Sequence, residues 1–366
     1  MRARTGPAAR RPALGRLAAL VTSVTLLSGC TLLAADDDPD QVTDAQRDDG
    51  TGRVVLVTHD SYALPKRLVA DFEAESGIDL VQRASGDAGS LTNRLVLTKD
   101  EPIGDVAFGV DNTFASRALE EDVFAPYDGA LPPGAEGFAL PGEERLVPID
   151  EGNVCVNVDE QWFADRDQEP PASLDDLTDP AYRDLMVVPG APTSSPGLAF
   201  LLATVDAYGE EWPSYWEDLV ANGVEIVPGW SDAYQVDFTA GGGEGDRPIV
   251  VSYDSSPAFT LTGDGERTTT AALLDTCYQQ VEYAGVLEGA ENPVGGARVV
   301  DWLLSSRVQA ELPTSMYVFP VREDVDLPRD WARFAERPER SYALDPAAVA
   351  SERADLLAEW SDVTSR

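Results

Sequence analysis

Apolar, largely β-branched runs alternate in the first part of the chain with segments whose apolar positions recur every three or four residues. The runs at 53–58, 78–82 and 105–110 predict short buried strands. The intervening segments 65–75 and 90–96 have helical spacing, and each begins with a residue that suits the start of a helix. The order strand, helix, strand, helix, strand predicts an α/β fold, with a mixed, mostly parallel sheet flanked by helices.

Two long extended segments, 146–158 and 271–283, separate this part of the chain from a second set of similar elements. Between them the chain again alternates predicted strands and helices, with strands at 186–190, 224–227 and 250–253 and helices at 198–208 and 212–220. We interpret the extended segments as crossovers between two lobes. The predicted boundaries are 51–152 together with 276–366 for lobe 1, and 153–275 for lobe 2.

Aromatic, hydroxyl and carboxylate side chains directly follow two predicted strands of lobe 2. Tyr253-Asp254-Ser255-Ser256 ends the run at 250, and Trp230-Ser231-Asp232 follows the run at 224–227. Open α/β sheets bind their ligands beyond the carboxyl ends of the strands. Two ordinary strand-to-loop corners are the alternative, but similar endings in lobe 1 favour a ligand site.

Ser194 and Ser195 precede the apolar helix predicted at 198–208. Hydroxyl groups beside the free amides of a helix start form an anion site without a basic residue. An ordinary helix cap followed by Pro196 is the alternative interpretation.

The first 29 residues contain five arginines, no acidic residue and an apolar run from Leu17 to Leu27. The run is too short to span a bilayer, and its ending at Cys30 resembles a bacterial lipoprotein signal. This resemblance implies removal of residues 1–29, acylation of Cys30 and an exported protein that meets the outer face of the cytoplasmic membrane through a lipid anchor only. An ordinary secretory signal is the alternative. Residues 30–50 are acidic and poor in apolar side chains, which predicts a disordered tether.

The chain has 65 acidic and 27 basic residues and a formal charge of −38. This balance argues against a nucleic-acid partner. It would attract a cationic ligand, although strong acidity is also a general trait of highly soluble proteins. One histidine, His59, and the lack of a C-x-x-C motif make a metal site a poor prediction, and we expect no cofactor. Cys155 and Cys277 either pair, as is common in exported proteins, or are two buried thiols.

Seven short motifs, in order along the whole folded part, resemble the thiamine-binding proteins that serve ABC importers. The motifs are THDSY at 58–62, SLTNRL at 90–95, VDN at 110–112, TSSPGL at 193–198, GWSDAY at 229–234, SYDSSPA at 252–258 and LPT at 312–314. The resemblance implies a two-lobed, class II periplasmic-binding-protein-like fold and no enzymatic activity. It also implies that thiamine or a thiamine phosphate binds between the lobes and passes to a permease with its ATPase, and we expect a monomer.

The same resemblance implies the ligand-binding residues. They are Asp87, Ala88, Ser194, Ser195, Trp230, Tyr253, Asp254, Ser255 and Ser256, to which the aromatic side chains Phe259 and Tyr317 are added. The chain departs from the family pattern in four places, with His59 for an aromatic residue, Asp254 for a hydroxyl residue, Phe259 for an aromatic with a hydroxyl, and Tyr317 for a tryptophan.

The chemistry of thiamine agrees with these residue types. Its thiazolium carries a fixed positive charge, which aromatic faces bind with about 0.5–2 kcal/mol each when desolvated. Trp230, Tyr253, Phe259 and Tyr317 supply such faces, while Asp60, Asp87 and Asp254 are candidate carboxylates.

Three other functions would use some of the same residues. A carrier of polyamines or another small cation would use the same residue types. A ferric-ion carrier typically uses adjacent tyrosines, and the chain has no Tyr-Tyr pair. A hydrolase is disfavoured because His59, Asp60 and Ser61 are consecutive, so neighbouring side chains point to opposite faces and form no local triad.

Overall fold

The computed structural model describes residues 43–365. The predicted signal segment 1–29, the predicted lipidation site Cys30 and the first part of the predicted tether lie outside the described residues. Within the described part, no helix is long and apolar enough to cross a membrane.

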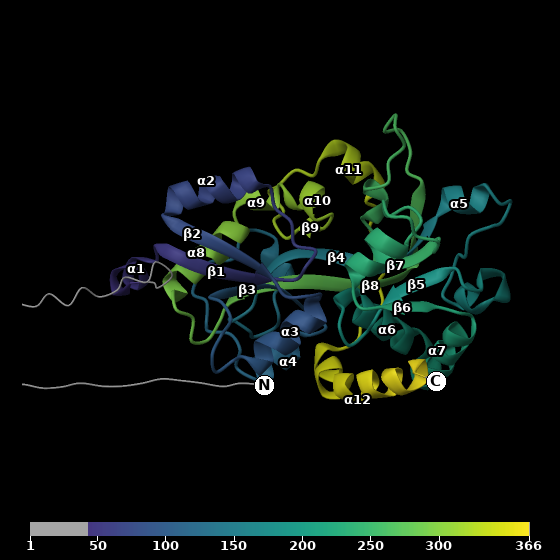
Figure 1. The fold of residues 1–366 in the computed structure, drawn as a ribbon, viewed down its shortest axis with the longest axis horizontal. Coiled ribbons are helices and arrows are strands. Elements are labelled where there is room, and N and C mark those ends of the chain that lie inside the picture. Colours follow the sequence, from purple (N-terminus) through teal and green to yellow (C-terminus); the bar gives the residue numbers. More distant parts are fainter. Residues whose placement is uncertain (1–42, 366) are drawn as a thin grey trace, which may run out of the picture. The chain divides into compact units, whose positions relative to one another are not determined.

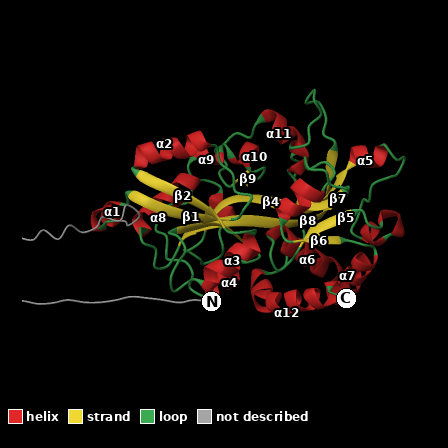
Figure 2. Cartoon of the chain, in the orientation of Figure 1, coloured by secondary structure: helices red, strands yellow, loops and turns green. Residues whose placement is uncertain are grey.

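One mixed sheet runs through the described chain, in the strand order β2-β1-β3-β8-β4-β7-β5-β6, with β9 paired to β4. The strands are β1 (Gly52–Thr58), β2 (Ile78–Ala84), β3 (Val106–Asp111), β4 (Val147–Asp159), β5 (Met186–Pro189), β6 (Glu225–Val227), β7 (Ile249–Tyr253), β8 (Thr270–Val286) and β9 (Phe319–Pro320). Figures 1 and 2 show helices on both faces of this sheet. The helices are α1 (Asp44–Asp49), α2 (Lys66–Ser76), α3 (Ala88–Leu97), α4 (Ala115–Glu120), α5 (Glu160–Ala164), α6 (Ser195–Tyr208), α7 (Trp212–Ala221), α8 (Pro293–Leu303), α9 (Ser306–Gln309), α10 (Leu312–Ser315), α11 (Arg329–Phe334) and α12 (Pro346–Thr364).

The two long strands β4 and β8 join a parallel group at each end of the sheet. β1 pairs in parallel with β2 and β3, and β5 pairs in parallel with β6 and β7. β4 and β8 are antiparallel to each other and to the neighbouring β7 and β3. The predicted α/β fold with two crossover segments is therefore confirmed, because the extended segments of the sequence are these two strands.

A disulfide joins the crossover strands, which is one of the two alternatives that the sequence leaves open for these cysteines. Cys155 on β4 and Cys277 on β8 are bonded, and both are fully buried. The register of β4 against β8 shifts between Val154 and Val156, where several residues of β8 bulge out of the ladder. The disulfide holds the two strands together at this irregularity.

The C-terminal helix α12 contacts segments of both predicted lobes, because its Arg353 donates to the Phe114 carbonyl at 3.4 Å. Trp360 of α12 contacts Trp216 of α7, with ring centroids 5.4 Å apart. The indole of Trp216 also donates to Thr204 Oγ1 of α6 at 2.9 Å. The predicted boundaries, with all of 276–366 in lobe 1, stay a prediction.

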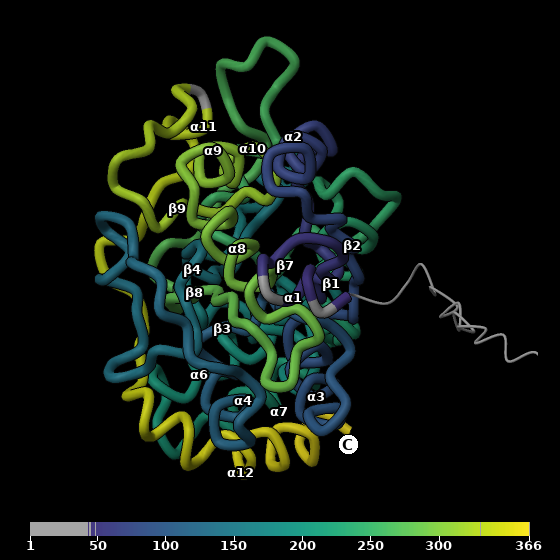
Figure 3. The backbone as a smooth tube through the Cα atoms, turned by 90° about the vertical axis from the view of Figure 1, so that its left-hand side faces the viewer, coloured from purple at the N-terminus to yellow at the C-terminus, as the bar shows by residue number. Residues whose placement is uncertain are grey.

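The last part of the predicted disordered tether is a short helix, α1. Thr43 and Gln46 form a capping box at its start, and Gly50 ends it in the left-handed conformation (φ +66°). Figure 3 shows α1 beside α8, where Arg298 donates to the Gly50 carbonyl at 3.4 Å. The caps at both ends of α1 and its contact with α8 give these residues an ordered structure, although their composition alone predicts a tether.

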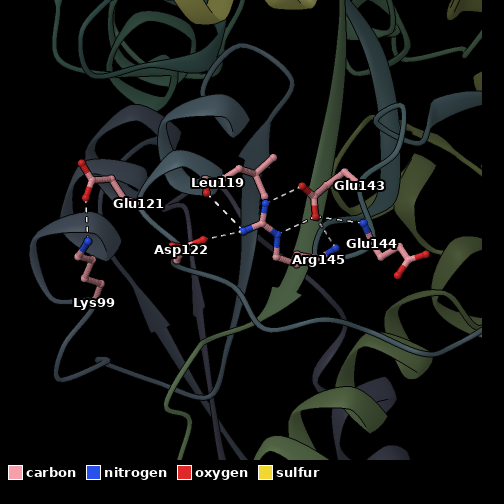
Figure 4. Close-up of polar contacts among 7 residues, drawn as sticks. All are labelled: Lys99, Leu119, Glu121, Asp122, Glu143, Glu144 and Arg145. Atoms are coloured by element: carbon pink, nitrogen blue, oxygen red, sulfur yellow. Dashed lines mark hydrogen bonds and ion pairs between the residues drawn. The ribbon is translucent and has the colours of Figure 1, made fainter.

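Arg145 ties the loop before β4 to the end of α4 (Figure 4). Its guanidinium donates to both oxygens of Glu143 at 2.8 Å, to Asp122 Oδ1 at 3.1 Å and to the Leu119 carbonyl at 3.3 Å. A planar, bidentate contact of this kind is stronger than an ordinary surface ion pair.

We expect Arg145→Ala to lower the free energy of unfolding by about 1 kcal/mol, because it removes a bidentate pair and one of the donors to the Leu119 carbonyl. Urea unfolding measures the change. Lys99→Ala is the control, since its amine makes one exposed contact with Glu121 at 2.8 Å, and its effect should be clearly smaller than that of Arg145→Ala. Equal losses in the two variants would contradict the prediction.

Candidate ligand-binding site

A cavity of about 130 Å³ lies at the carboxyl ends of the parallel strands, between segments of both predicted lobes. Its lining residues are His59, Ser61, Ala63, Asp87, Ser195, Pro196, Trp230, Gln235, Tyr253, Glu282, Ser315, Met316 and Val318. They come from loops after β1, β2, β5 and β6, from β7 and β8, and from the segment after α10. This is the position where open α/β sheets bind ligands.

An aromatic hollow adjoins the cavity. Its lining residues are Trp230, Tyr234, Gln235, Tyr253, Ser256, Phe259, Met316 and Tyr317, four of which also line the cavity. Trp230 stacks on Tyr234 with centroids 5.1 Å apart and an interplanar angle of 11°. Tyr253 meets the edge of Trp230 at 6.3 Å, and Phe259 meets Tyr317 at 5.1 Å. The two spaces together offer polar groups on one side and flat rings on the other.

Asp87 connects the two sides of the cavity directly. It caps α3 by accepting from the Ala88 amide at 2.6 Å, and its other oxygen accepts from the Trp230 amide at 2.7 Å. A second contact runs from the Ser90 amide to the Thr193 carbonyl at 3.1 Å. Burial raises the pKa of Asp87, and the bonds from Trp230 and Ala88 oppose that change. The two lobes therefore meet at the cavity through the backbone of the tryptophan itself.

A short hydroxyl network fixes the tryptophan ring. The Trp230 indole donates to Ser252 Oγ at 2.9 Å, and Ser252 Oγ lies 2.8 Å from Ser256 Oγ. Ser256 Oγ in turn accepts from the Tyr253 amide at 3.1 Å. The strand end and the turn after it thus hold both rings by hydrogen bonds as well as by packing.

The structure brings most predicted site residues together. Asp87, Ser195, Trp230 and Tyr253 line the cavity, while Ser256, Phe259 and Tyr317 line the hollow. Ala88 is buried at the start of α3, and Ser194 is fully buried as the cap of α6, where its hydroxyl accepts from the Gly197 amide at 3.4 Å. Neither side chain is part of either lining.

Three predicted residues lie elsewhere. The Asp254 carboxylate faces the crossover strand, where it accepts from the Asn153 amide at 3.2 Å and from Asn153 Nδ2 at 2.8 Å. Burial raises its pKa to about 6. Ser255 donates to the Tyr317 carbonyl, and Asp60 is exposed. Asp254 is the first residue after β7, and its bonds to Asn153 hold its carboxylate away from the cavity that Tyr253 lines.

Several lining residues escaped the sequence analysis. Tyr234 and Gln235 lie on a π-helical turn, Asp232–Asp237, a rare conformation that is frequent at functional sites. Met316 follows a short helix in the C-terminal region, and Glu282 lies in the middle of β8 rather than at its end. Trp230 and Tyr234 are four residues apart and stack on each other. This spacing is the sequence signal that could have identified Tyr234 as a lining residue.

His59 lines the cavity and is almost fully buried. Its Nδ1 lies 2.8 Å from Ser61 Oγ, and its Nε2 lies 3.5 Å from Glu282 Oε2. Burial lowers the pKa of His59, but the neighbouring carboxylates, Glu282 first, outweigh it, so the pKa lies above the ordinary 6.5. Glu282 therefore stabilises the protonated form of His59, against the effect of burial.

The buried carboxyl group of Asp111 is expected to make the stability of the fold depend on pH. Burial raises its pKa to about 7, so between pH 4 and pH 7 the folded chain binds a proton that the unfolded chain has released, and stability falls as the pH rises. Asp111→Asn keeps the Oδ1 acceptor for Thr113 and Phe114 and removes the charge. We expect urea unfolding to show a gain of about 1–2 kcal/mol at pH 8 and almost none at pH 4.5. A gain that does not depend on pH would contradict this origin.

A family model described as bacterial extracellular solute-binding protein matches residues 101–335. This chain belongs to that family. The solute-binding protein is 28% identical over 321 residues to the thiamine-binding periplasmic protein of Escherichia coli (strain K12), with 86% of this chain and 94% of the relative covered. It is 29% identical over 325 residues to the protein of the same description from Brucella suis biovar 1 (strain 1330), with 86% and 92% covered.

Solved structures confirm the fold. The solute-binding protein resembles a periplasmic thiamin binding protein with a TM-score of 0.75 and 28% identity, covering 86% of this chain and 96% of that one. Iron-bound HitA from Pseudomonas aeruginosa matches with a TM-score of 0.65 and 20% identity, covering 85% and 99%. At that identity the second likeness shows the two-lobed fold alone. The relatives are binding proteins and not enzymes.

Proposed function

We propose that this solute-binding protein captures thiamine between its two lobes and delivers it to the permease of an ABC importer. The observation that carries the proposal is the cavity itself, in which the faces of Trp230 and Tyr253 adjoin the carboxylates of Asp87 and Glu282. Rings and carboxylates together suit a flat ligand with a fixed positive charge. The relatives named for thiamine binding support the same ligand.

The mechanism is binding and closure without catalysis. A ligand that contacts both lobes binds more tightly when the lobes are together than when they are apart. This difference in binding free energy is the amount by which the ligand stabilises the closed arrangement. The bond from the Trp230 amide to Asp87 belongs to the arrangement with the lobes together. A permease that recognises closed lobes would then receive the ligand.

Export and anchoring complete the proposal. The charged start, the short apolar run and Cys30 support a lipoprotein signal. The disulfide between Cys155 and Cys277 is consistent with an oxidising compartment. The protein then acts as a monomer on the outer face of the cytoplasmic membrane, held by its lipid.

Isothermal titration calorimetry of the purified protein tests the ligand. We expect saturable binding of thiamine at one site per chain and no saturable binding of spermidine or ferric citrate at the same concentrations. Clear binding of spermidine without binding of thiamine would replace thiamine by a polyamine, and binding of ferric citrate alone would indicate an iron carrier.

A further inference from the structure

His59 is the only side chain among the described lining residues that can carry a positive charge. The residues that line the cavity and the aromatic hollow include no lysine and no arginine within the described part of the chain, while Asp87 and Glu282 supply two carboxylates. The exposed fraction of His59 is 5%. It is also the only histidine in the 366-residue chain. Any proton that this protein holds on an imidazole is therefore held at the ligand site.

The fold keeps the imidazole ring in one place. His59 immediately follows β1, and its ring packs against Phe108 of β3 with centroids 5.4 Å apart. The next residue of β3, Gly109, has φ +103°, and a Cβ there would collide with His59 Cδ2. Nδ1 of the ring lies 2.8 Å from Ser61 Oγ. The glycine thus makes room for the ring, and the serine hydroxyl sets its rotation.

This rotation directs the second ring nitrogen toward Glu282. His59 Nε2 lies 3.5 Å from Glu282 Oε2 and has no hydrogen-bond partner among residues 43–365. The contact is therefore electrostatic and depends on a proton on the ring. Burial lowers the pKa of His59, but Glu282, Asp87 and Asp60 together raise it above its ordinary value.

Glu282 belongs to a row of three buried carboxyl groups across the sheet. Asp111 on β3 and Asp150 on β4 are both register partners of Glu282 on β8, so the three side chains project from one face. Both oxygens of Asp150 are buried without a hydrogen-bond partner in the described part of the chain. Like charges directly opposite each other on adjacent strands are destabilising. A proton on His59 offsets part of this repulsion at the cavity end of the row.

The other titratable groups around the row lie outside this contact. Arg353 interacts with Asp111 from α12 and is not a lining residue. Arg337 pairs with Glu151, which neighbours the row on the opposite face of the sheet. Burial raises the pKa of Tyr253 well above its ordinary value, so its phenol stays neutral. The exchangeable positive charge of the cavity thus resides on the imidazole.

We propose that capture of thiamine exchanges a proton for the cation of the ligand, with His59 as the group that gives up the proton. This inference rests on the proposed function and adds a proton-linked step to it. Before the ligand enters, protonated His59 pairs with Glu282. Two positive charges in one partly desolvated cavity repel each other. The thiazolium charge is permanent, whereas an imidazole can lose its proton near neutral pH, so the proton passes to the solvent and Glu282 faces the ligand.

Release of a proton makes binding tighter as the pH rises. The effect appears in the pH range where His59 of the ligand-free protein loses its proton, and the neighbouring carboxylates place that range above 6.5. We expect thiamine affinity to rise by about tenfold between pH 6 and pH 8, which corresponds to a change of about one unit in the pKa of His59 on binding.

NMR spectroscopy of the purified protein without a histidine tag follows the proton directly, because one histidine gives one imidazole signal. We expect this signal to titrate with a midpoint above pH 6.5 without ligand and about one pH unit lower with saturating thiamine. Calorimetry at pH 7 in two buffers of different ionisation enthalpy measures the released proton independently. A midpoint that thiamine leaves unchanged, or raises, would overturn the inference.

Two variants assign the proton to its residue. His59→Gln has no imidazole proton to give up, so its thiamine affinity should change by less than about twofold between pH 6 and pH 8 and should exceed that of the wild type at pH 6. Asp111→Asn is the matched comparison, since it removes a neighbouring titratable group outside the cavity lining, and it should keep most of the wild-type pH dependence. The opposite pattern, with the dependence kept in His59→Gln and lost in Asp111→Asn, would refute the role of His59.

The remaining outcomes separate the inference from the function on which it rests. Should His59→Gln fail to fold by circular dichroism, His59→Phe keeps a flat ring and provides the second test, with the same expected loss of pH dependence. Failure of the wild type to bind thiamine at every pH would refute the proposed function and this inference with it. Thiamine binding whose affinity stays constant between pH 6 and pH 8 would refute the proton exchange alone.

Discussion

Replacing Trp230 by alanine is expected to weaken thiamine binding by at least tenfold and by as much as about a hundredfold. The indole lines both the cavity and the hollow and stacks on Tyr234, so its loss removes a ring face worth about 0.5–2 kcal/mol to a desolvated cation. It also leaves Ser252 without the donor 2.9 Å away. Buried tryptophans in the middle of a binding surface commonly carry losses of this size. Titration calorimetry with thiamine measures the change.

Two further variants separate the roles of this tryptophan. Trp230→Phe keeps a flat ring and loses the indole donor, so we expect a smaller loss of about threefold. Trp162→Ala removes a tryptophan from α5, outside both linings, and should change thiamine affinity by less than twofold. If Trp162→Ala and Trp230→Ala weaken binding equally, the effect is a general loss of folding and not a loss of ligand contact.

Loss of the disulfide is expected to have the largest effect on stability. The bond closes a loop between residues 122 positions apart, and in the chain-entropy account such a crosslink stabilises the folded state by about 4 kcal/mol. Cys155→Ala combined with Cys277→Ala should lower the free energy of unfolding by that amount, as urea unfolding with circular dichroism would show.

Reduction of the wild-type disulfide provides the matched comparison. Both sulfur atoms are buried, so the alanine variant also loses a little packing, whereas the reduced wild type keeps every atom. Similar losses in the two samples would assign the effect to the crosslink. A loss under about 1 kcal/mol in both would show that the packing of β4 against β8 suffices without it.

The framework of the fold could be predicted from local sequence because strand and helix periods are strong signals. The crossover strands stand out as long extended segments, and the first lobe has regular alternation of apolar runs and helical spacing. The short helix α1 was missed, although Thr43 and Gln46 have the spacing of a capping box and Gly50 suits its end. There the acidic composition outweighed the local signal.

The site was predictable where it lies at strand ends and not where it depends on pairing between strands. Trp230 and Tyr253 were found because aromatic residues directly follow apolar runs. Asp254 was misplaced because it was grouped with Tyr253, whereas it lies just past the end of β7 and bonds to Asn153 of the crossover strand. Glu282 lies within a strand, and its importance depends on the register that sets it between Asp111 and Asp150. Such long-range register has no local sequence signal.

The position of Glu282 on a crossover strand has a consequence for the order of events during capture. In the predicted boundaries, β8 connects the lobes, so we expect the Glu282 carboxylate to stay in place when the lobes part. Trp230 and Tyr253 fall in predicted lobe 2, and we expect them to move with it. A cationic ligand would thus meet the Glu282 carboxylate first, at the base of the open cleft. The rings of Trp230 and Tyr253 would close over the ligand afterwards.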